Sequence, residues 1–259
     1  YETVPEIMTK PFIAYLQRTV DAWLYTAEKN KSPLITHGLT TARFVKGFNA
    51  VSPASGEATG DVRRKLGMTQ ASVALVLASR AIHDKGWDIA IDATRQVRAV
   101  TGRDVRLILV GDGENAEAMR ERAKGTSYVH FWGPTGDVAA IIGDCDLAVF
   151  PTTYSGESFP LFLLECFAGG LPVVAADVGS IREMMTTDDG AVAGAVIATN
   201  VDRGRMAKDL AAAIAELISG PEPLEAARMH ARKRAEHYDT DKMARLYLEI
   251  FASLSTKRR

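Results

Sequence analysis

Two glutamates that could do chemistry stand in the stretch YSGESFPLFLLECFAGGLPVVAAD, residues 154–177. They are Glu157 and Glu165, with seven residues between them, and Pro160 lies inside the gap. Proline is well tolerated in the first turn of a helix, because its missing N–H would have no partner there. We therefore expect Glu157 in a loop and Glu165 in the second turn of the helix that follows.

The start of this predicted helix offers free backbone N–H groups near Ser158, Phe159 and Leu161. Such groups bind phosphate with the help of the helix dipole. A carboxylate on either side could accept hydrogen bonds from neutral hydroxyls, those of a sugar and of a ribose. Each glutamate also has an ordinary alternative: Glu157 as a charge that offsets the helix dipole, and Glu165 as an exposed helix position. The helix is otherwise apolar on nearly every side, which favours a role for Glu165.

The stretch RAIHDKG, residues 80–86, follows a predicted strand and supplies two cations, Arg80 and Lys85. A pyrophosphate spreads its negative charge over several oxygens, so two cations on one loop suit it. The alternative is a solvated loop whose charges are incidental.

A third loop, GDGENA at residues 111–116, fits the looser form of the dinucleotide fingerprint and raises NAD as a ligand. That fingerprint also requires an acidic residue at the end of the next strand, to hold the ribose. The next predicted strand ends in Trp132, Gly133 and Pro134, with no acid. We therefore favour a tight turn for Gly111 and Gly113.

Short apolar strands alternate with amphipathic helices from about residue 71 onward. Strands are predicted at residues 72–79, 105–110, 128–132, 146–151 and 172–177, and helices at 88–100, 115–124, 137–144, 160–169 and 180–185. The strands are continuous apolar runs, as expected when both faces of a sheet are covered. This alternation predicts an α/β fold, a Rossmann-like doubly wound parallel sheet. Ligands of such sheets bind outside the carboxyl ends of the strands, where all three loops above fall.

The two ends of the chain have a different pattern. We expect one amphipathic helix at residues 12–30, a short strand at 33–37 and a loop or linker at 48–60. Three consecutive helices are predicted near the other end, at 203–218, 223–238 and 241–254. These flanking helices are not part of the strand–helix alternation.

The composition is that of an ordinary globular protein. The 259 residues are 47% hydrophobic and 24% charged, and the net charge of −1 favours no nucleic-acid partner. Cys145 and Cys166 do not form a disulfide framework, so we expect a reducing cytoplasm. No apolar run approaches the roughly 20 residues that span a bilayer. The chain begins at Tyr1 and not at a methionine, so we expect further sequence upstream.

Several of these stretches, in this order and spacing, resemble the nucleotide-sugar half of retaining glycosyltransferases of family 4, which have the GT-B fold. The stretches are RAIHDKG, LVGDGENAEAMRERA, the long run from Val129 to Met185, and YDTDKMARLYLEIF. The most specific part is Glu157-x7-Glu165 followed by Ala168-x-Gly170-x-Pro172 and Asp177-x-Gly179-Ser180. The resemblance covers residues from about 33 to the end of the sequence. It departs from the family at Ser79, where a glycine usually precedes the arginine.

The resemblance implies roles for the four charged residues. Arg80 and Lys85 would bind the donor pyrophosphate and stabilise the leaving nucleoside diphosphate, UDP or GDP. Glu157 would contact the donor sugar and orient its anomeric carbon, and Glu165 would hold the ribose. The backbone at Ser158, Phe159 and Leu161 would meet the phosphates, and the segment of Phe131, Trp132 and Gly133 would border the base. No metal or other cofactor is expected, because cations and a helix start replace the ion.

The resemblance also implies that the amino-terminal domain of such enzymes is not in this sequence, apart from its trailing edge. We therefore assign residues 1–41 to that edge or a linker helix, 42–237 to the donor-binding domain, and 238–259 to a closing helix that crosses back. The expected partners are a nucleoside-diphosphate sugar, a carbohydrate, lipid-linked or protein acceptor, and the missing domain or a partner subunit. Peripheral contact with the inner face of a membrane fits a lipid-linked acceptor.

We expect the isolated chain to bind a nucleotide but to transfer little or no sugar. The alternative function is a non-catalytic module that binds nucleotide sugars or regulates another subunit. Less favoured alternatives are a sugar phosphorylase, an epimerase and the NAD-dependent oxidoreductase.

Overall fold

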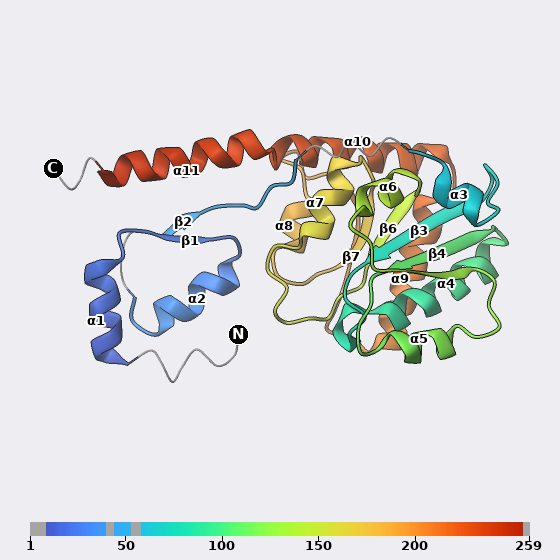
Figure 1. Ribbon diagram of the computed structural model, residues 1–259, viewed down its shortest axis with the longest axis horizontal. Coiled ribbons are helices and arrows are strands. Elements are labelled where there is room, and N and C mark those ends of the chain that lie inside the picture. The colour runs from blue at the N-terminus through green and yellow to red at the C-terminus, as the bar shows by residue number, and fades with distance from the viewer. Residues whose placement is uncertain (1–8, 40–43, 53–57, 256–259) are drawn as a thin grey trace.

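The computed structural model describes residues 9–39, 44–52 and 58–255, and a six-stranded parallel sheet forms its centre (Figure 1). The strand order is β5-β4-β3-β6-β7-β8. The strands are β3 (Val73–Ala78), β4 (Val105–Val110), β5 (Val129–Gly133), β6 (Leu147–Phe150), β7 (Val173–Ala176) and β8 (Gly194–Ile197). The predicted Rossmann-like doubly wound sheet is therefore confirmed.

Helices cover both faces of the sheet. The helices that follow or flank its strands are α3 (Asp61–Lys65), η1 (His83–Lys85), α4 (Trp87–Thr101), α5 (Ala116–Arg122), α6 (Val138–Gly143), α7 (Leu161–Ala168), α8 (Ile181–Met185), α9 (Arg203–Leu217) and α10 (Pro221–His237). Residues of α4, α5 and α9 form one hydrophobic cluster with the sheet, and residues of α3, α6, α7 and α8 form the other. Helix α10 contributes to both, with Ala227 in the first cluster and Ala231 in the second.

Strand β3 shows why the predicted strands read as continuous apolar runs. Leu75 and Leu77 belong to the first cluster, whereas Ala74 and Val76 belong to the second, and none of the four is exposed to solvent. Successive side chains of a strand point to opposite faces, so a strand covered on both faces needs an apolar residue at every position. Burial of this kind is the main stabilising contribution of the sheet.

The strand order places the functional edge of the sheet. The chain moves outward from β3 to β4 and β5, and then returns to lay β6 against the other side of β3. The carboxyl ends of β3 and β6 are therefore the topological switch point, where open α/β sheets bind their ligands. The segments that follow these two strands, residues 79–86 and 151–160, lie next to each other at this edge.

The amino-terminal region differs from its prediction. In place of one helix at 12–30 and a strand at 33–37, the structure has α1 (Lys10–Thr19), β1 (Trp23–Tyr25), α2 (Glu28–Thr36) and β2 (Phe44–Lys46). Strand β1 pairs with β2 in parallel, and the Trp23 and Phe44 rings lie 6.4 Å apart. This contact between distant segments outweighs the local helical pattern, which is how tertiary context commonly overrides propensity.

The last helix, α11 (Thr240–Ser255), extends beyond the sheet toward the side where α1 and α2 lie (Figure 1). The three closing helices are confirmed within a few residues. Strand β8 and helix α3 were not predicted. Strand β8 lies at the edge of the sheet and three of its four residues are only partly buried, so it lacks the full burial of the inner strands, and α3 is a single short helix rich in charged residues. Of the predicted loop at 48–60, residues 53–57 lie outside the described part of the chain.

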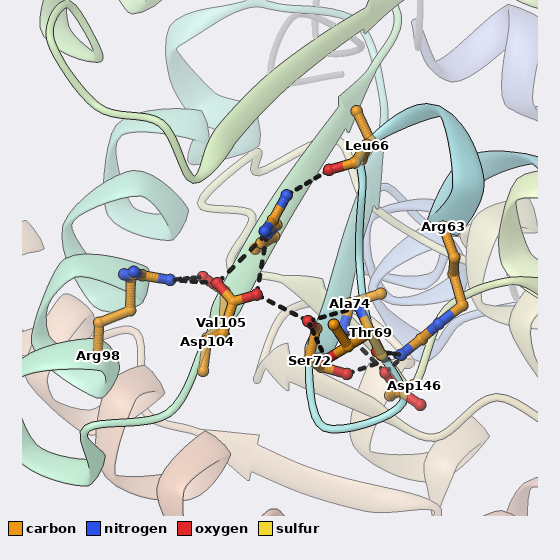
Figure 2. Close-up of polar contacts among 10 residues, drawn as sticks. Arg63, Leu66, Thr69, Ser72, Ala74, Arg98, Asp104, Val105 and Asp146 are labelled. Atoms are coloured by element: carbon orange, nitrogen blue, oxygen red, sulfur yellow. Dashed lines mark hydrogen bonds and ion pairs between the residues drawn. The ribbon is translucent and has the colours of Figure 1, made fainter.

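A polar network closes the opposite, amino-terminal edge of the sheet (Figure 2). The Asp104 carboxylate accepts hydrogen bonds from Ser72 Oγ at 2.7 Å and from Arg98 Nη1 at 3.0 Å. The Asp146 carboxylate accepts from Arg63 Nη1 at 3.0 Å and from the backbone N–H of Ala74 at 2.8 Å.

The same network joins elements that are distant in sequence. Arg63 of α3 also donates to the carbonyl oxygens of Thr69 and Ser72, at 3.0 and 2.8 Å. Helix α3 and the loop after it are thereby fixed to the starts of β3 and β6. Since hydrogen bonds of this kind satisfy polar groups that burial would otherwise leave unpaired, the network stabilises this edge.

We predict that Asp104→Asn lowers the free energy of unfolding at pH 7 by about 1–2 kcal/mol, since the carboxylate is only partly buried. Partial burial acts to raise the pKa of Asp104, but hydrogen bonds from Arg106, Ser72 and Arg98 outweigh it and hold the pKa well below its ordinary value. A depressed folded-state pKa stabilises the fold above the unfolded-state value of about 3.9. The difference between wild type and variant should therefore shrink as the pH falls below about 4.

Urea unfolding at several pH values measures this difference. Glu117→Gln is the control, because Glu117 is 83% exposed in its ion pair with Arg120. A difference for Asp104→Asn that is the same at pH 3 and pH 7 would contradict the prediction.

Candidate functional site

A buried ion pair between Lys85 and Glu157 joins the two segments at the switch point. Lys85 Nζ donates to Glu157 Oε2, and each residue is only 9% exposed. Thr152 Oγ1 lies 3.5 Å from the same carboxylate oxygen, and the Tyr154 ring lies 4.9 Å from Lys85 Nζ. The sequence analysis placed the loops of both residues at the carboxyl ends of the strands, and the structure brings the two side chains into direct contact.

Two glycines allow the backbone around this pair to approach closely. Gly86 has φ +72°, and a Cβ there would lie 2.3 Å from the carbonyl oxygen of Pro151. Gly179 has φ +61°, and a Cβ there would lie 2.2 Å from the carbonyl oxygen of Glu157. Any side chain would force the loops apart, so both positions require glycine. Gly179 was identified only as part of the family resemblance, and its contact with Glu157 was not foreseen.

Ser79, the departure from the family, has a clear structural role. Its hydroxyl accepts a hydrogen bond from Trp87 Nε1 at 2.9 Å, and its backbone N–H donates to Val110 O at 3.0 Å. The indole N–H is thereby satisfied although Trp87 is only 2% exposed. The serine is therefore compatible with this turn.

Arg80 and Glu165, the other two predicted charges, differ from the central pair. Arg80 is exposed, and its guanidinium forms no hydrogen bond or ion pair with residues 9–39, 44–52 or 58–255. Glu165 is half-buried in the second turn of α7, as predicted, and its carboxylate likewise has no hydrogen-bond partner in those ranges. Burial raises the pKa of the Glu165 carboxyl above its ordinary value. Two predicted site charges are therefore free to meet a ligand.

The start of α7 is also open. Pro160 precedes the first helical residue in an extended conformation, and no side chain caps the helix. Leu161 is 52% exposed at this position, whereas the Phe159 ring is buried against Tyr238 at 5.4 Å. Ser158 Oγ donates to Asn30 Oδ1 at 2.9 Å. The side chain of Phe159 is thus committed to packing, and only its backbone remains for binding.

The predicted base-binding segment lies at the end of β5. The Phe131 ring is 6.2 Å from Trp87, on one face of the sheet, and the Trp132 ring lies 4.1 Å from Lys65 Nζ, against the other cluster. Gly133 accepts a hydrogen bond from Gly111 N at 2.9 Å. Since both aromatic side chains are engaged, the backbone is what this segment can offer a ligand.

The loop at 111–116 is fastened to the loop after β3. Ala81 N donates to Asp112 O at 2.9 Å, and Asn115 N donates to Ala81 O at 2.8 Å. These backbone contacts agree with the tight turn that we favoured for this stretch. They also fix the backbone of Ala81, the residue after Arg80, against this loop.

Comparison with known proteins gives the family. A family model described as "Glycosyl transferases group 1" matches residues 72–220, which is more than half of the chain. The chain belongs to this family. The matched region contains the Lys85–Glu157 pair, Arg80 and Glu165. This membership agrees with the resemblance inferred from the motifs of the chain.

Curated relatives carry mannosyltransferase names. The chain is 30% identical over 223 residues to a GDP-mannose-dependent monoacylated alpha-(1-6)-phosphatidylinositol monomannoside mannosyltransferase of Corynebacterium glutamicum, covering 82% of this chain and 55% of the relative. It is 28% identical over 194 residues to a GDP-mannose-dependent alpha-(1-6)-phosphatidylinositol dimannoside mannosyltransferase of Mycobacterium tuberculosis, covering 74% and 47%. The chain thus spans about half the length of the curated relatives it matches.

Solved structures share the fold. The structure of HepE from Anabaena in complex with UDP and glucose superposes with a TM-score of 0.78 at 20% identity, covering 96% of this chain and 70% of that one. The glycosyltransferase WaaG superposes with a TM-score of 0.68 at 21% identity, covering 88% and 61%. Within the described ranges, the chain has no helix long and apolar enough to cross a membrane.

We predict that Glu165→Gln increases the free energy of unfolding at pH 7. The raised pKa means that folding disfavours the ionised carboxyl, so the wild type loses stability as the pH rises through the unfolded-state value of about 4.3 and then the folded-state pKa. The gain should therefore disappear below about pH 4, where the carboxyl is protonated in both states. Urea unfolding across this pH range tests it, with the exposed helical Glu216→Gln as control. A variant less stable than wild type at pH 7 would contradict the prediction.

We predict that Glu157→Gln, in contrast, lowers the free energy of unfolding. This substitution leaves the buried Lys85 ammonium without its carboxylate, and removing one partner of a buried pair costs about 3–5 kcal/mol. Urea unfolding at pH 7 measures the loss. The control is Glu183→Gln in the exposed Lys46–Glu183 pair, whose loss should stay below about 1 kcal/mol. Equal losses for the two variants would contradict the prediction.

Proposed function

We propose that this chain is the donor-binding half of a retaining glycosyltransferase, which transfers a sugar from a nucleoside-diphosphate sugar to an acceptor. The observation that carries the proposal is the Lys85–Glu157 contact at the switch point, beside the uncapped start of α7. A cation, a carboxylate and free backbone N–H groups there offer partners for a phosphate and for sugar hydroxyls together.

The diphosphate would be held by charge and by backbone. Arg80, which has no partner among the described residues, would bind it from one side, and Lys85 would share its ammonium between Glu157 and the phosphate. The N–H groups at the start of α7 would donate to the same oxygens. These groups lie where negative charge grows on the leaving nucleoside diphosphate, so they would stabilise the transition state without a metal ion.

The two glutamates would accept hydrogen bonds from hydroxyl groups of the donor. Glu165 would accept hydrogen bonds from the ribose, which would give its half-buried carboxylate the partner that it lacks within the described chain. Glu157 would accept from the sugar and so orient the anomeric carbon toward the acceptor. Retention needs no protein nucleophile in the front-face route that the family resemblance implies.

The names of the relatives indicate which donor to test first. Two of them are named as GDP-mannose-dependent, and HepE was solved with UDP and glucose, so GDP-mannose and UDP-glucose are the first candidates. A lipid-linked acceptor in the manner of the phosphatidylinositol mannosides would place the protein at a membrane surface. Acceptor contacts would come from the remaining half, since the relatives are about twice as long as this match. We keep 1–41, 42–237 and 238–259 as the proposed division of the chain.

The alternative is a module that binds nucleotide sugars without catalysis. Both functions require donor binding, so binding alone does not separate them. Transfer of sugar by this chain when it is joined to an amino-terminal half would support the enzyme. The family membership favours that outcome.

We predict that the chain binds GDP or UDP in isothermal titration calorimetry and does not bind NAD. Arg80→Ala and Glu165→Gln should each lower the affinity for the nucleoside diphosphate by about tenfold or more, as expected when a hydrogen bond to a charged group is lost. The control Arg95→Ala removes an exposed arginine of α4 and should leave the affinity unchanged. If neither nucleotide nor any sugar conjugate of them binds, the proposed function is wrong.

A further inference from the structure

A short segment from outside the six-stranded sheet lies against the loop that carries Glu157. We call residues 26–30 the crossing segment; it links β1 to the first turn of α2. Lys29 Nζ donates to the carbonyl oxygen of Ser155 at 2.5 Å, and Asn30 Oδ1 accepts from Ser158 Oγ at 2.9 Å. Ser180 Oγ also donates to Thr26 O at 3.2 Å, so the crossing segment makes three polar contacts with the region of the sheet.

Lys29 lies close to the catalytic carboxylate of the proposed mechanism. Burial lowers the pKa of its ammonium, while the charge of Glu157 acts in the opposite direction. The Glu157 backbone is held by the same loop, because its N–H donates to Tyr154 O at 2.9 Å. Glu157 is therefore influenced by two lysines, Lys85 from the loop after β3 and Lys29 from the crossing segment.

The neighbouring Lys31 shows that this placement is specific to Lys29. Lys31 Nζ pairs with Glu28 at 3.5 Å and lies 5.0 Å from the Tyr25 ring, so its contacts stay within its own region of the chain. Ala27, which lies between Thr26 and Lys29 in the segment, is 1% exposed and anchors it. The segment fixed in this way holds the Lys29 ammonium against a loop more than a hundred residues away in sequence.

We propose that Lys29 is a positioning residue, which holds the loop at 154–158 so that Glu157 faces the sugar of the donor. The inference rests on the proposed function, because it assigns Glu157 to the sugar. It separates two parts of the ligand. The nucleoside diphosphate is bound by Arg80, Lys85, Glu165 and the start of α7, whereas the sugar depends on Glu157 and hence on Lys29.

The test compares a nucleoside diphosphate with its own sugar conjugate, GDP with GDP-mannose or UDP with UDP-glucose, by calorimetry on the 259-residue chain. Lys29→Met should lower the affinity for the sugar conjugate by about fivefold, which is the usual effect of one lost hydrogen bond. The affinity for the free diphosphate should change by less than about twofold. Lys29→Arg keeps the charge and a donor and should recover part of the loss. Lys31→Met is the matched control and should change neither affinity.

The outcomes distinguish the inference from the function on which it rests. Wild type that binds neither ligand would remove the proposed function. If the wild type binds both ligands and Lys29→Met binds them with the same affinities, the role of Lys29 is overturned and the proposed function stands. An equal loss for the diphosphate and the conjugate would also overturn it, because a general disturbance of the fold weakens both. Unfolding midpoints of the variants measured alongside identify such a disturbance.

Discussion

The buried pair of Lys85 and Glu157 is the constraint on which the arrangement of the site depends. The two residues are 72 positions apart, and they meet only because β6 returns to lie beside β3. A buried pair is costly to form, since both charges leave water, so its geometry must be fixed by the surrounding backbone. Gly86 and Gly179 provide that geometry by letting neighbouring loops come within van der Waals contact of the segment that holds Glu157. The order of the strands, the glycines and the ion pair are one structural unit.

The two edges of the sheet differ in how far their charged side chains are paired. At the amino-terminal edge, Asp104 and Asp146 are surrounded by donors, and the network serves stability (Figure 2). At the carboxyl edge, Glu165 keeps a half-buried carboxylate without a partner in the described chain, and Arg80 remains exposed. A half-buried carboxylate without a partner lowers stability but leaves binding capacity, so Glu165 trades stability for the ability to bind. The contrast supports the proposal that the carboxyl edge is the functional one, and it does so without any sequence motif.

Local sequence carried most of the information about the sheet and the charged residues. Strands β3, β6 and β7 could be predicted because burial on both faces demands an apolar residue at every position, and β4 and β5 could be predicted because most of their residues are apolar. Glu157 and Glu165 could be placed because Pro160 marks the helix start. What failed depends on distant contacts. Pairing of β1 with β2 broke the predicted helix at 12–30, and the roles of Gly179 and Lys29 follow from loops that only the folded chain brings together. No local sequence pattern predicts these contacts between distant segments.

The crossing segment bears on how the chain divides into domains. The proposed boundary at residue 41 falls between β1 and β2, yet these strands pair with each other, so residues 44–46 associate with the region before that boundary. The segment after β1 in turn reaches the loop of Glu157 through Lys29 and Asn30. In the proposed function, donor binding and the position of the amino-terminal region would therefore be coupled through this one loop. A ligand that reoriented Glu157 would change the contacts of Ser155 and Ser158, and movement of the amino-terminal region would in turn change the position of the carboxylate, as reciprocal linkage requires.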